Sequence, residues 1–286
     1  ELAKQLLGRT YDVARPGVVA IYLTGSLPAG CGPHDVAIAL VGKLFKSGYV
    51  KNKVMEFVGP GIASLRQDTR NAIDAMTTET TCLSSIWETD ETTHRFLAVH
   101  GRAADYKKLA PADLAYYDGV VEVDLSAIRP MIALPMHPSN AFTIEELNAN
   151  LEDILHACEQ DVQKLIGRKD VSLDLCSKIE NGKLRVDQGV IAGCAGGLYD
   201  SIYEAASILK GHTGGCGDYA LSVYPGSQPI MMELVRTGVI SDLMASGATI
   251  RTAFCGPCFG AGDVPANGAL SIRHTARNFP SREGSK

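Results

Sequence analysis

The chain has 286 residues, of which 45% are hydrophobic and 21% are charged. This composition excludes an intrinsically disordered chain, and the length is sufficient for two globular domains. The formal net charge of −5 argues against nucleic acid as a partner, because the chain lacks the general excess of basic residues that binds phosphate backbones.

The chain start and the apolar runs indicate where the protein works. Residues 1–8 lack the charged start, long apolar centre and cleavage site of a secretory signal. No apolar run approaches the roughly 20 residues that span a bilayer. We therefore expect a cytoplasmic protein without membrane contact, in which the eight cysteines are reduced thiols, some of them metal-bound.

Strand and helix signals alternate in the first part of the chain, which is typical of a mostly parallel sheet. Gly59-Pro60-Gly61 ends the second strand of a βαβ unit. The predicted elements, in order, are a strand over 17–24, a helix from Asp35, a strand over 53–58, a helix over about 65–81, a third helix from Thr89 and a strand over 120–125.

The second part of the chain repeats this alternation. Residues 130–140 are predicted to form an ordered loop, and Thr143 with Glu146 forms a capping box that starts a long amphipathic helix, with Cys158 on its apolar face. Strands are predicted over 189–193, 219–224 and 249–254, with a helix from Tyr199. We predict an α/β fold with two three-layer α/β/α domains, one over residues 1–118 and one over 119–286.

Three cysteines follow predicted strands. Cys194 lies in Gly193-Cys-Ala-Gly-Gly197, and Cys255-Gly-Pro-Cys258 places two thiols around a tight turn. Because the carboxyl ends of parallel strands meet at one crevice, these segments are expected to face each other there. Three thiolates suit a soft metal, yet a CxxC pair also occurs in zinc and redox sites, and Cys194 alone is equally typical of a buried small residue.

The other cysteines and one histidine have simpler interpretations. Cys31-Gly-Pro-His34 superficially resembles a metal motif, but it lacks a partner CxxC and is interpreted as loop chemistry. His274 is interpreted as a satisfied or exposed loop histidine. Cys82, Cys176 and Cys216 lack the spacing of ligands and are interpreted as ordinary thiols.

Several ordered motifs resemble the aconitase and 3-isopropylmalate dehydratase superfamily over nearly the whole chain. Cys255-Gly-Pro-Cys258 is similar to the second ligand motif of that family, and the segment around Cys194 is similar to the first. The segment from Gly59 through Glu79 resembles the family segment that carries an active-site glutamate. Arg277-Asn-Phe-Pro-Ser-Arg282 resembles the segment whose two arginines bind substrate carboxylates.

The resemblance implies a fold like the second and third domains of that family. It also implies a cofactor, roles for the site residues and a type of reaction. Cys194, Cys255 and Cys258 would hold a [4Fe–4S] cluster, whose open iron would bind the substrate hydroxyl and carboxylate. Glu79 would lie near the leaving hydroxyl, while Arg277 and Arg282 would bind carboxylate. The reaction would be the reversible dehydration of a hydroxy polycarboxylic acid.

The sequence also departs from the family pattern. Ala75, Gly196 and Ala276 stand where the family has asparagines. The upstream domain and the C-terminal swivel domain of the family have no counterpart in these residues, so we expect a fragment or split subunit that is inactive alone. These departures leave a second interpretation open, a non-catalytic binding or regulatory protein on the same scaffold.

Overall fold

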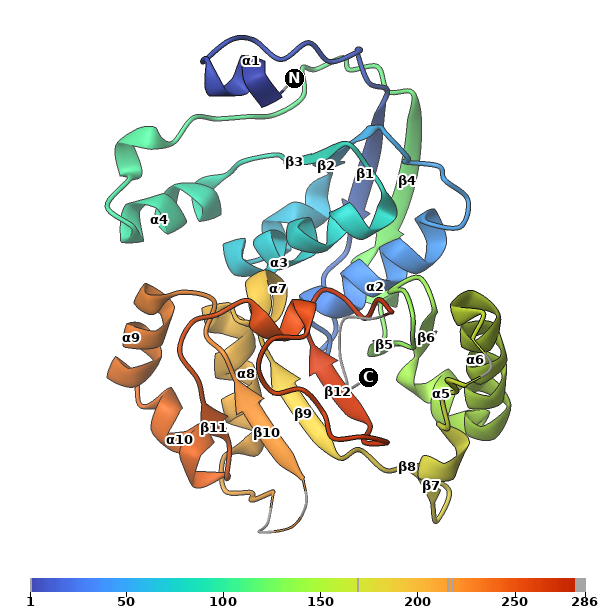
Figure 1. Cartoon of the computed structure of the whole chain (residues 1–286). Helices are drawn as coiled ribbons and strands as arrows, with labels where there is room; N and C mark the ends of the chain where they lie inside the picture. The colour runs from blue at the N-terminus through green and yellow to red at the C-terminus, as the bar shows by residue number, and fades with distance from the viewer. Residues whose placement is uncertain (1, 169, 215–216, 218, 281–286) are drawn as a thin grey trace.

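The computed structural model describes residues 2–168, 170–214, 217 and 219–280. It is a mixed α/β structure with two four-stranded parallel sheets, so the predicted fold class is confirmed. Figure 1 shows one sheet in the upper half and the other in the lower half, with α2 (Pro33–Leu44), α3 (Gln67–Thr77) and α7 (Gly193–Gly196) between them. No helix in these described ranges combines the length and apolar character needed to cross a membrane.

The first sheet has the strand order β3-β2-β1-β4. Its elements besides α2 and α3 are β1 (Val18–Thr24), β2 (Val54–Val58), β3 (Ser84–Trp87), α4 (Glu91–Val99) and β4 (Gly119–Asp124), preceded by α1 (Leu2–Leu6). Short 3₁₀ turns join them: η1 (Pro60–Ser64), η2 (Thr78–Thr80), η3 (Ala103–Asp105) and η4 (Leu125–Ala127). The predicted βαβ unit is confirmed, because β1 and β2 are parallel and α2 connects them.

Alternate residues of these strands make the first core. Val19, Ile21 and Leu23 of β1 are fully buried and pack with Leu40 of α2 and Ile73 of α3. The period of two along the strand and the helical period along α2 therefore point at the same core.

Strand β4 changes the expected division of the chain. The predicted boundary at residue 118 puts this segment in the second unit, yet β4 pairs in parallel with β1, with Val19 opposite Gly119. A boundary set by sheet membership therefore falls after Asp124 rather than at residue 118. The division into two domains itself stays a prediction.

The middle of the chain is more structured than predicted. Inside the expected loop over 130–140, β5 (Met131–Ala133) begins an antiparallel pair with β6 (Ala141–Thr143). The Thr143–Glu146 capping box is present, but the helix it starts is broken at Asn150 into α5 (Ile144–Ala149) and α6 (Leu151–Ile166). Cys158 is buried in the core below α6, as predicted. The turn η5 (Cys176–Lys178) and the hairpin β7 (Ile179–Glu180) and β8 (Lys183–Leu184) follow.

The second sheet has the strand order β11-β10-β9-β12. Its strands are β9 (Gln188–Ile191), β10 (Ala220–Val223), β11 (Thr249–Ile250) and β12 (Ser271–His274), with helices α8 (Tyr199–Leu209), α9 (Gln228–Arg236) and α10 (Val239–Ala245) and the turn η6 (Gly256–Phe259). Strand β11 is shorter than predicted, so a loop over 251–254 separates it from Cys255, and β12 was missed. All four strands are parallel, so their carboxyl ends lie on one edge.

Candidate functional site

The three predicted cysteine ligands come from two turns at the carboxyl edge of the second sheet. Cys194 lies in α7, which follows β9, while Cys255 and Cys258 lie at the start and inside of η6. Helix α7 and turn η6 are in contact. Cys194 and Cys255 are exposed and Cys258 is buried. The fold thus brings these segments together, and leaves two of their thiols accessible.

Glycine at position 193 permits this approach. Gly193 has a φ of +84°, and a Cβ atom there would lie 2.9 Å from the Cys258 sulfur. Only glycine combines that backbone conformation with the absence of a side chain at low cost. The Gly-Cys sequence therefore sets how closely α7 lies against η6.

The electrostatics of Cys258 follow from its position. Burial, followed by the neighbouring charge of Cys255, raises the pKa of Cys258 to about 11. Its thiol therefore keeps its proton at neutral pH when no cation is nearby, since desolvation disfavours the thiolate. Binding of a metal would displace that proton, as thiolate is the form that ligates metals.

An ion pair joins the two halves of the structure beside these cysteines. Arg277 Nε donates to Glu79 Oε1 at 2.7 Å, although the two residues are 198 positions apart. Glu79 lies in η2 after α3 and is 4% exposed, whereas Arg277 follows β12 and is 36% exposed. The predicted glutamate and the first predicted arginine are therefore partners, each from a different sheet unit.

The charge environment of Arg277 places it near the thiols. Burial lowers the pKa of Arg277, but Glu79, Cys194 and Cys258 outweigh it and raise the pKa above its ordinary value. A guanidinium has five N–H donors, and the bond to Glu79 uses only Nε. The terminal nitrogens are thus suited to a second anion. Arg282, the other predicted arginine, lies outside the described residues.

Two histidines that the sequence analysis dismissed lie between the sheet units. His34 is in the first turn of α2, and its ring lies 3.7 Å from that of His274 at the end of β12, measured between centroids. His34 is 8% exposed. Cys31 and Gly32 lie in a loop, as predicted, but His34 belongs to α2 and His274 to β12, so the loop interpretation was wrong for the two histidines. Pro33 at the helix start was the available signal, since proline is frequent at the first helical position.

Burial controls the charge of this histidine pair. It lowers the pKa of His274 to about 4, and burial followed by the charge of His274 lowers the pKa of His34 well below its ordinary value. Both rings are therefore neutral at pH 7, because burial disfavours the charged imidazolium.

The three positions that depart from the family pattern have structural roles in the contact between α2, α3 and α7. Ala75 and Ala276 belong to an apolar cluster, which we call the alanine seam and which contains Ala37, Ile38, Ala72, Met76, Ala195 and Ala276, with Ala75 and Leu198 among the residues packed against it. A Cβ atom at Gly196 would overlap the carbonyl oxygen of His274. Small apolar residues thus occupy the three positions at which the family pattern has asparagines.

Comparison with known proteins places this geometry in a family. The model of the Aconitase family (aconitate hydratase) matches residues 1–286. The 3-isopropylmalate dehydratase large subunit of a Thermoanaerobacter species is 31% identical over 274 residues, which cover 94% of this chain and 56% of the relative. The 2,3-dimethylmalate dehydratase large subunit of Eubacterium barkeri is 29% identical over 270 residues, with the same coverage. Aconitase X of Thermococcus kodakaraensis, in its holo form, aligns with a TM-score of 0.43 and 11% identity, over 95% of this chain and 53% of that one.

The protein belongs to a class of α/β proteins with two parallel sheets, in which a cysteine-bearing sheet edge lies beside an ion pair that joins the two sheet units. More particularly, the chain belongs to the aconitase family. It spans about half the length of the curated relatives it matches, and those relatives are named as large subunits of dehydratases. The predicted family membership is confirmed.

Proposed function

We propose that the chain binds a [4Fe–4S] cluster through Cys194, Cys255 and Cys258 and forms the cluster-bearing part of a hydro-lyase. The observation that carries the proposal is the meeting of α7 and η6 beside the Glu79–Arg277 ion pair. Membership in the aconitase family and the dehydratase names of the relatives support it.

The donor set suits such a cluster. Three cysteine thiolates leave one iron open, and two of the three thiols here are accessible. When bound, the cluster would supply a Lewis acid that polarises the hydroxyl of a hydroxy polycarboxylic acid. Arg277 would hold a substrate carboxylate through its terminal nitrogens. Arg282, which is not among the described residues, would bind carboxylate in the same way.

Glu79 has a double role in this proposal. Its buried carboxylate orients the Arg277 guanidinium through the 2.7 Å bond. It would also exchange a proton with the leaving hydroxyl, which is a general acid–base role. The base that removes the carbon-bound proton would come from segments that the relatives have beyond the matched half. We infer that those segments complete the catalytic unit. We also infer that the protein is cytoplasmic.

Iron and acid-labile sulfide per chain test the cluster directly. After anaerobic reconstitution, we expect about four irons and four sulfides per chain, as in clusters held by cysteine. Alanine at Cys194, Cys255 or Cys258 should each abolish this uptake, because each variant lacks a ligand. Cys31→Ala is the matched control and should reconstitute normally.

Iron uptake that survives all three replacements would refute the assigned ligands. Zinc without iron or sulfide in anaerobically prepared protein would instead show that these cysteines bind a single zinc ion. Circular dichroism of each variant should be recorded to check that the chain is folded.

Turnover tests the assigned roles of Arg277 and Glu79. In the reconstituted complete gene product, Arg277→Lys should raise KM for the polycarboxylate roughly tenfold or more, since lysine cannot reproduce bidentate binding. Glu79→Gln should lower kcat by about 100-fold or more, because it removes a proton-exchanging group. Arg236→Lys, in the exposed Arg236–Glu233 pair, is the control and should match the unchanged protein.

The alanine seam motivates a second candidate, a non-catalytic binding or regulatory protein on the same scaffold. Ala75, Gly196 and Ala276 remove polar groups from the surroundings of the candidate site. Robust hydratase activity of the reconstituted complete gene product would exclude this candidate. Normal cluster content without turnover of hydroxy polycarboxylates would support it.

A further inference from the structure

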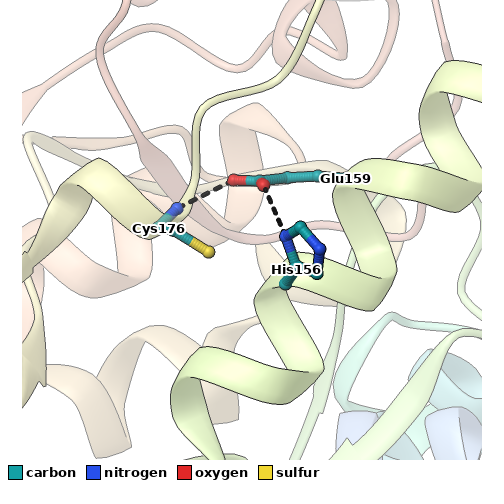
Figure 2. Close-up of side chains that lie close together, drawn as sticks. All are labelled: His156, Glu159 and Cys176. Atoms are coloured by element: carbon teal, nitrogen blue, oxygen red, sulfur yellow. Dashed lines mark hydrogen bonds and ion pairs between the residues drawn. The ribbon is translucent and has the colours of Figure 1, made fainter.

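A histidine, a glutamate and a cysteine outside the candidate cluster site gather at α6. The ligand atoms of His156, Glu159 and Cys176 all lie within 4.8 Å of one another. Figure 2 shows the three side chains pointing toward one space, His156 and Glu159 from α6 and Cys176 from η5. In Figure 1, α6 lies at the right edge of the molecule, apart from α7.

The glutamate is held in position by the backbone of the facing segment. Glu159 Oε1 accepts hydrogen bonds from the amides of Leu175 and Cys176, at 2.5 and 2.8 Å. This leaves Oε2, which lies 3.7 Å from His156 Nδ1. A carboxylate fixed through one oxygen presents the other to a metal with little loss of conformational freedom, as is common around metal ligands.

The histidine has a similar support. The amide nitrogen Nε2 of Gln160 lies 2.9 Å from His156 Nε2. Amide nitrogen and oxygen are exchanged by a half turn, so Nε2–H can donate to Gln160 Oε1 while Nδ1 keeps its lone pair. His156 is 64% exposed, and its ring is therefore accessible to an ion from solvent.

The surrounding charge favours a cation. Three carboxylates, Glu152, Glu159 and Asp174, act electrostatically on the Cys176 thiol. A surface hollow lies beside the group, lined by Glu159, Gln160, Gln163, Lys164, Ser172 and Leu173. It gives an incoming ion a route and leaves space for a water ligand.

We propose that His156, Glu159 and Cys176 form a zinc site with one water as the fourth ligand. Nitrogen, oxygen and thiolate sulfur together are donors that Zn²⁺ accepts in tetrahedral sites. Donor atoms around one zinc lie about 3.3–3.8 Å apart, given bond lengths of about 2.0–2.3 Å. The distance between His156 Nδ1 and Glu159 Oε2 already falls in this range, and the Cys176 sulfur lies within 4.8 Å of the ligand atoms of the other two residues.

A zinc ion bound at this site would connect α6 to η5. The ion would join the helix to the segment that leads through β7 and β8 into β9. Because metal binding to the folded state adds to its stability, Zn²⁺ should raise the melting temperature of the chain. The cysteine that the sequence analysis treated as an ordinary thiol would then be a ligand.

Titration with Zn²⁺ under anaerobic conditions tests the site. The protein is the full chain with Cys255→Ser and Cys258→Ser, which removes the other thiol pair. We expect one Zn²⁺ per chain in competition with a chromophoric chelator, and Co²⁺ should give a thiolate-to-cobalt absorption band. His156→Ala, Glu159→Gln and Cys176→Ser should each weaken binding at least about tenfold, and Cys176→Ser should remove the band.

The controls separate this site from surface binding. Glu159→Gln keeps an oxygen that can accept hydrogen bonds from the amides of Leu175 and Cys176. It therefore tests the carboxylate as a metal ligand without removing the hydrogen bonds that hold η5 against α6. His94→Ala changes another histidine paired with a glutamate at helical spacing, Glu91 at 3.4 Å, and should leave binding unchanged. Absence of Zn²⁺ binding, or binding that survives both His156→Ala and Cys176→Ser, would overturn the proposal.

Discussion

Alanine at position 196 should lower the free energy of unfolding by more than about 3 kcal/mol, the upper end of what overpacking costs. A Cβ atom there would overlap the carbonyl oxygen of His274 and lie 2.8 Å from its carbonyl carbon. Both are backbone atoms at the end of β12, so no side-chain rotation relieves the clash. The urea midpoint, followed by far-UV circular dichroism, measures the effect.

Gly214→Ala is the matched control for this substitution. A Cβ atom at Gly214 would make only ordinary contacts, at 3.6–4.0 Å, with Tyr219 and Ser246. Its midpoint should stay close to that of the unchanged chain. A Gly196→Ala protein of normal stability would mean that α7 lies farther from β12 than described. The same clash prevents Gly196→Asn from restoring the family's residue without a backbone shift.

Removal of the Arg70 side chain should cost about 3–5 kcal/mol of unfolding free energy, because it leaves a partly buried carboxylate without its partner. Arg70 is 1% exposed and forms two bonds with Asp90, at 2.6 and 3.0 Å. It also donates to the carbonyl oxygens of Leu65 and Ile62. Arg70→Ala therefore also leaves two carbonyls of the η1 region without this donor.

The pH dependence of stability provides a second measurement on this pair. Burial raises the pKa of Asp90, but the bonds from Arg70 and from the helix amides outweigh it and hold the pKa below its ordinary value of 3.8. A lowered folded-state pKa stabilises the protein above the ordinary value, and this contribution is lost as the pH falls through the lowered one. The stability difference between the unchanged chain and Arg70→Ala should therefore shrink below about pH 4.

Arg102→Ala provides the comparison. Arg102 pairs with Asp105 at 2.7 Å, but both side chains are more than half exposed. Exposed pairs contribute up to about 1 kcal/mol, so this variant should unfold almost normally. Equal losses for Arg70→Ala and Arg102→Ala would contradict the assignment of Arg70 as a buried anchor.

Local chemistry made much of the fold predictable. The short apolar run over residues 17–24 and the apolar spacing of α2 identified the βαβ unit, and Thr143 with Glu146 identified a helix start. Such signals act within a few residues, so the sequence displays them directly. The break at Asn150 and the short strands β5 and β6 were missed, because neighbouring elements stabilise them.

The cysteine turns illustrate how far local patterns extend toward the site. A strand followed by Gly193-Cys194, and a CxxC turn, indicated two segments at one sheet edge, and α7 does contact η6. The prediction worked because parallel strands carry their carboxyl ends to the same side. Their role as cluster ligands stays a prediction.

The sequence by itself determined the α/β alternation, the cysteine turns and the family to which the chain belongs. Only the tertiary structure decided which distant groups meet: Glu79 with Arg277, His34 with His274, and Cys176 with Glu159. The physical reason is that these contacts depend on how separately folded segments pack together. Turn and helix signals are local, whereas the partner of a buried charge is set by the whole fold.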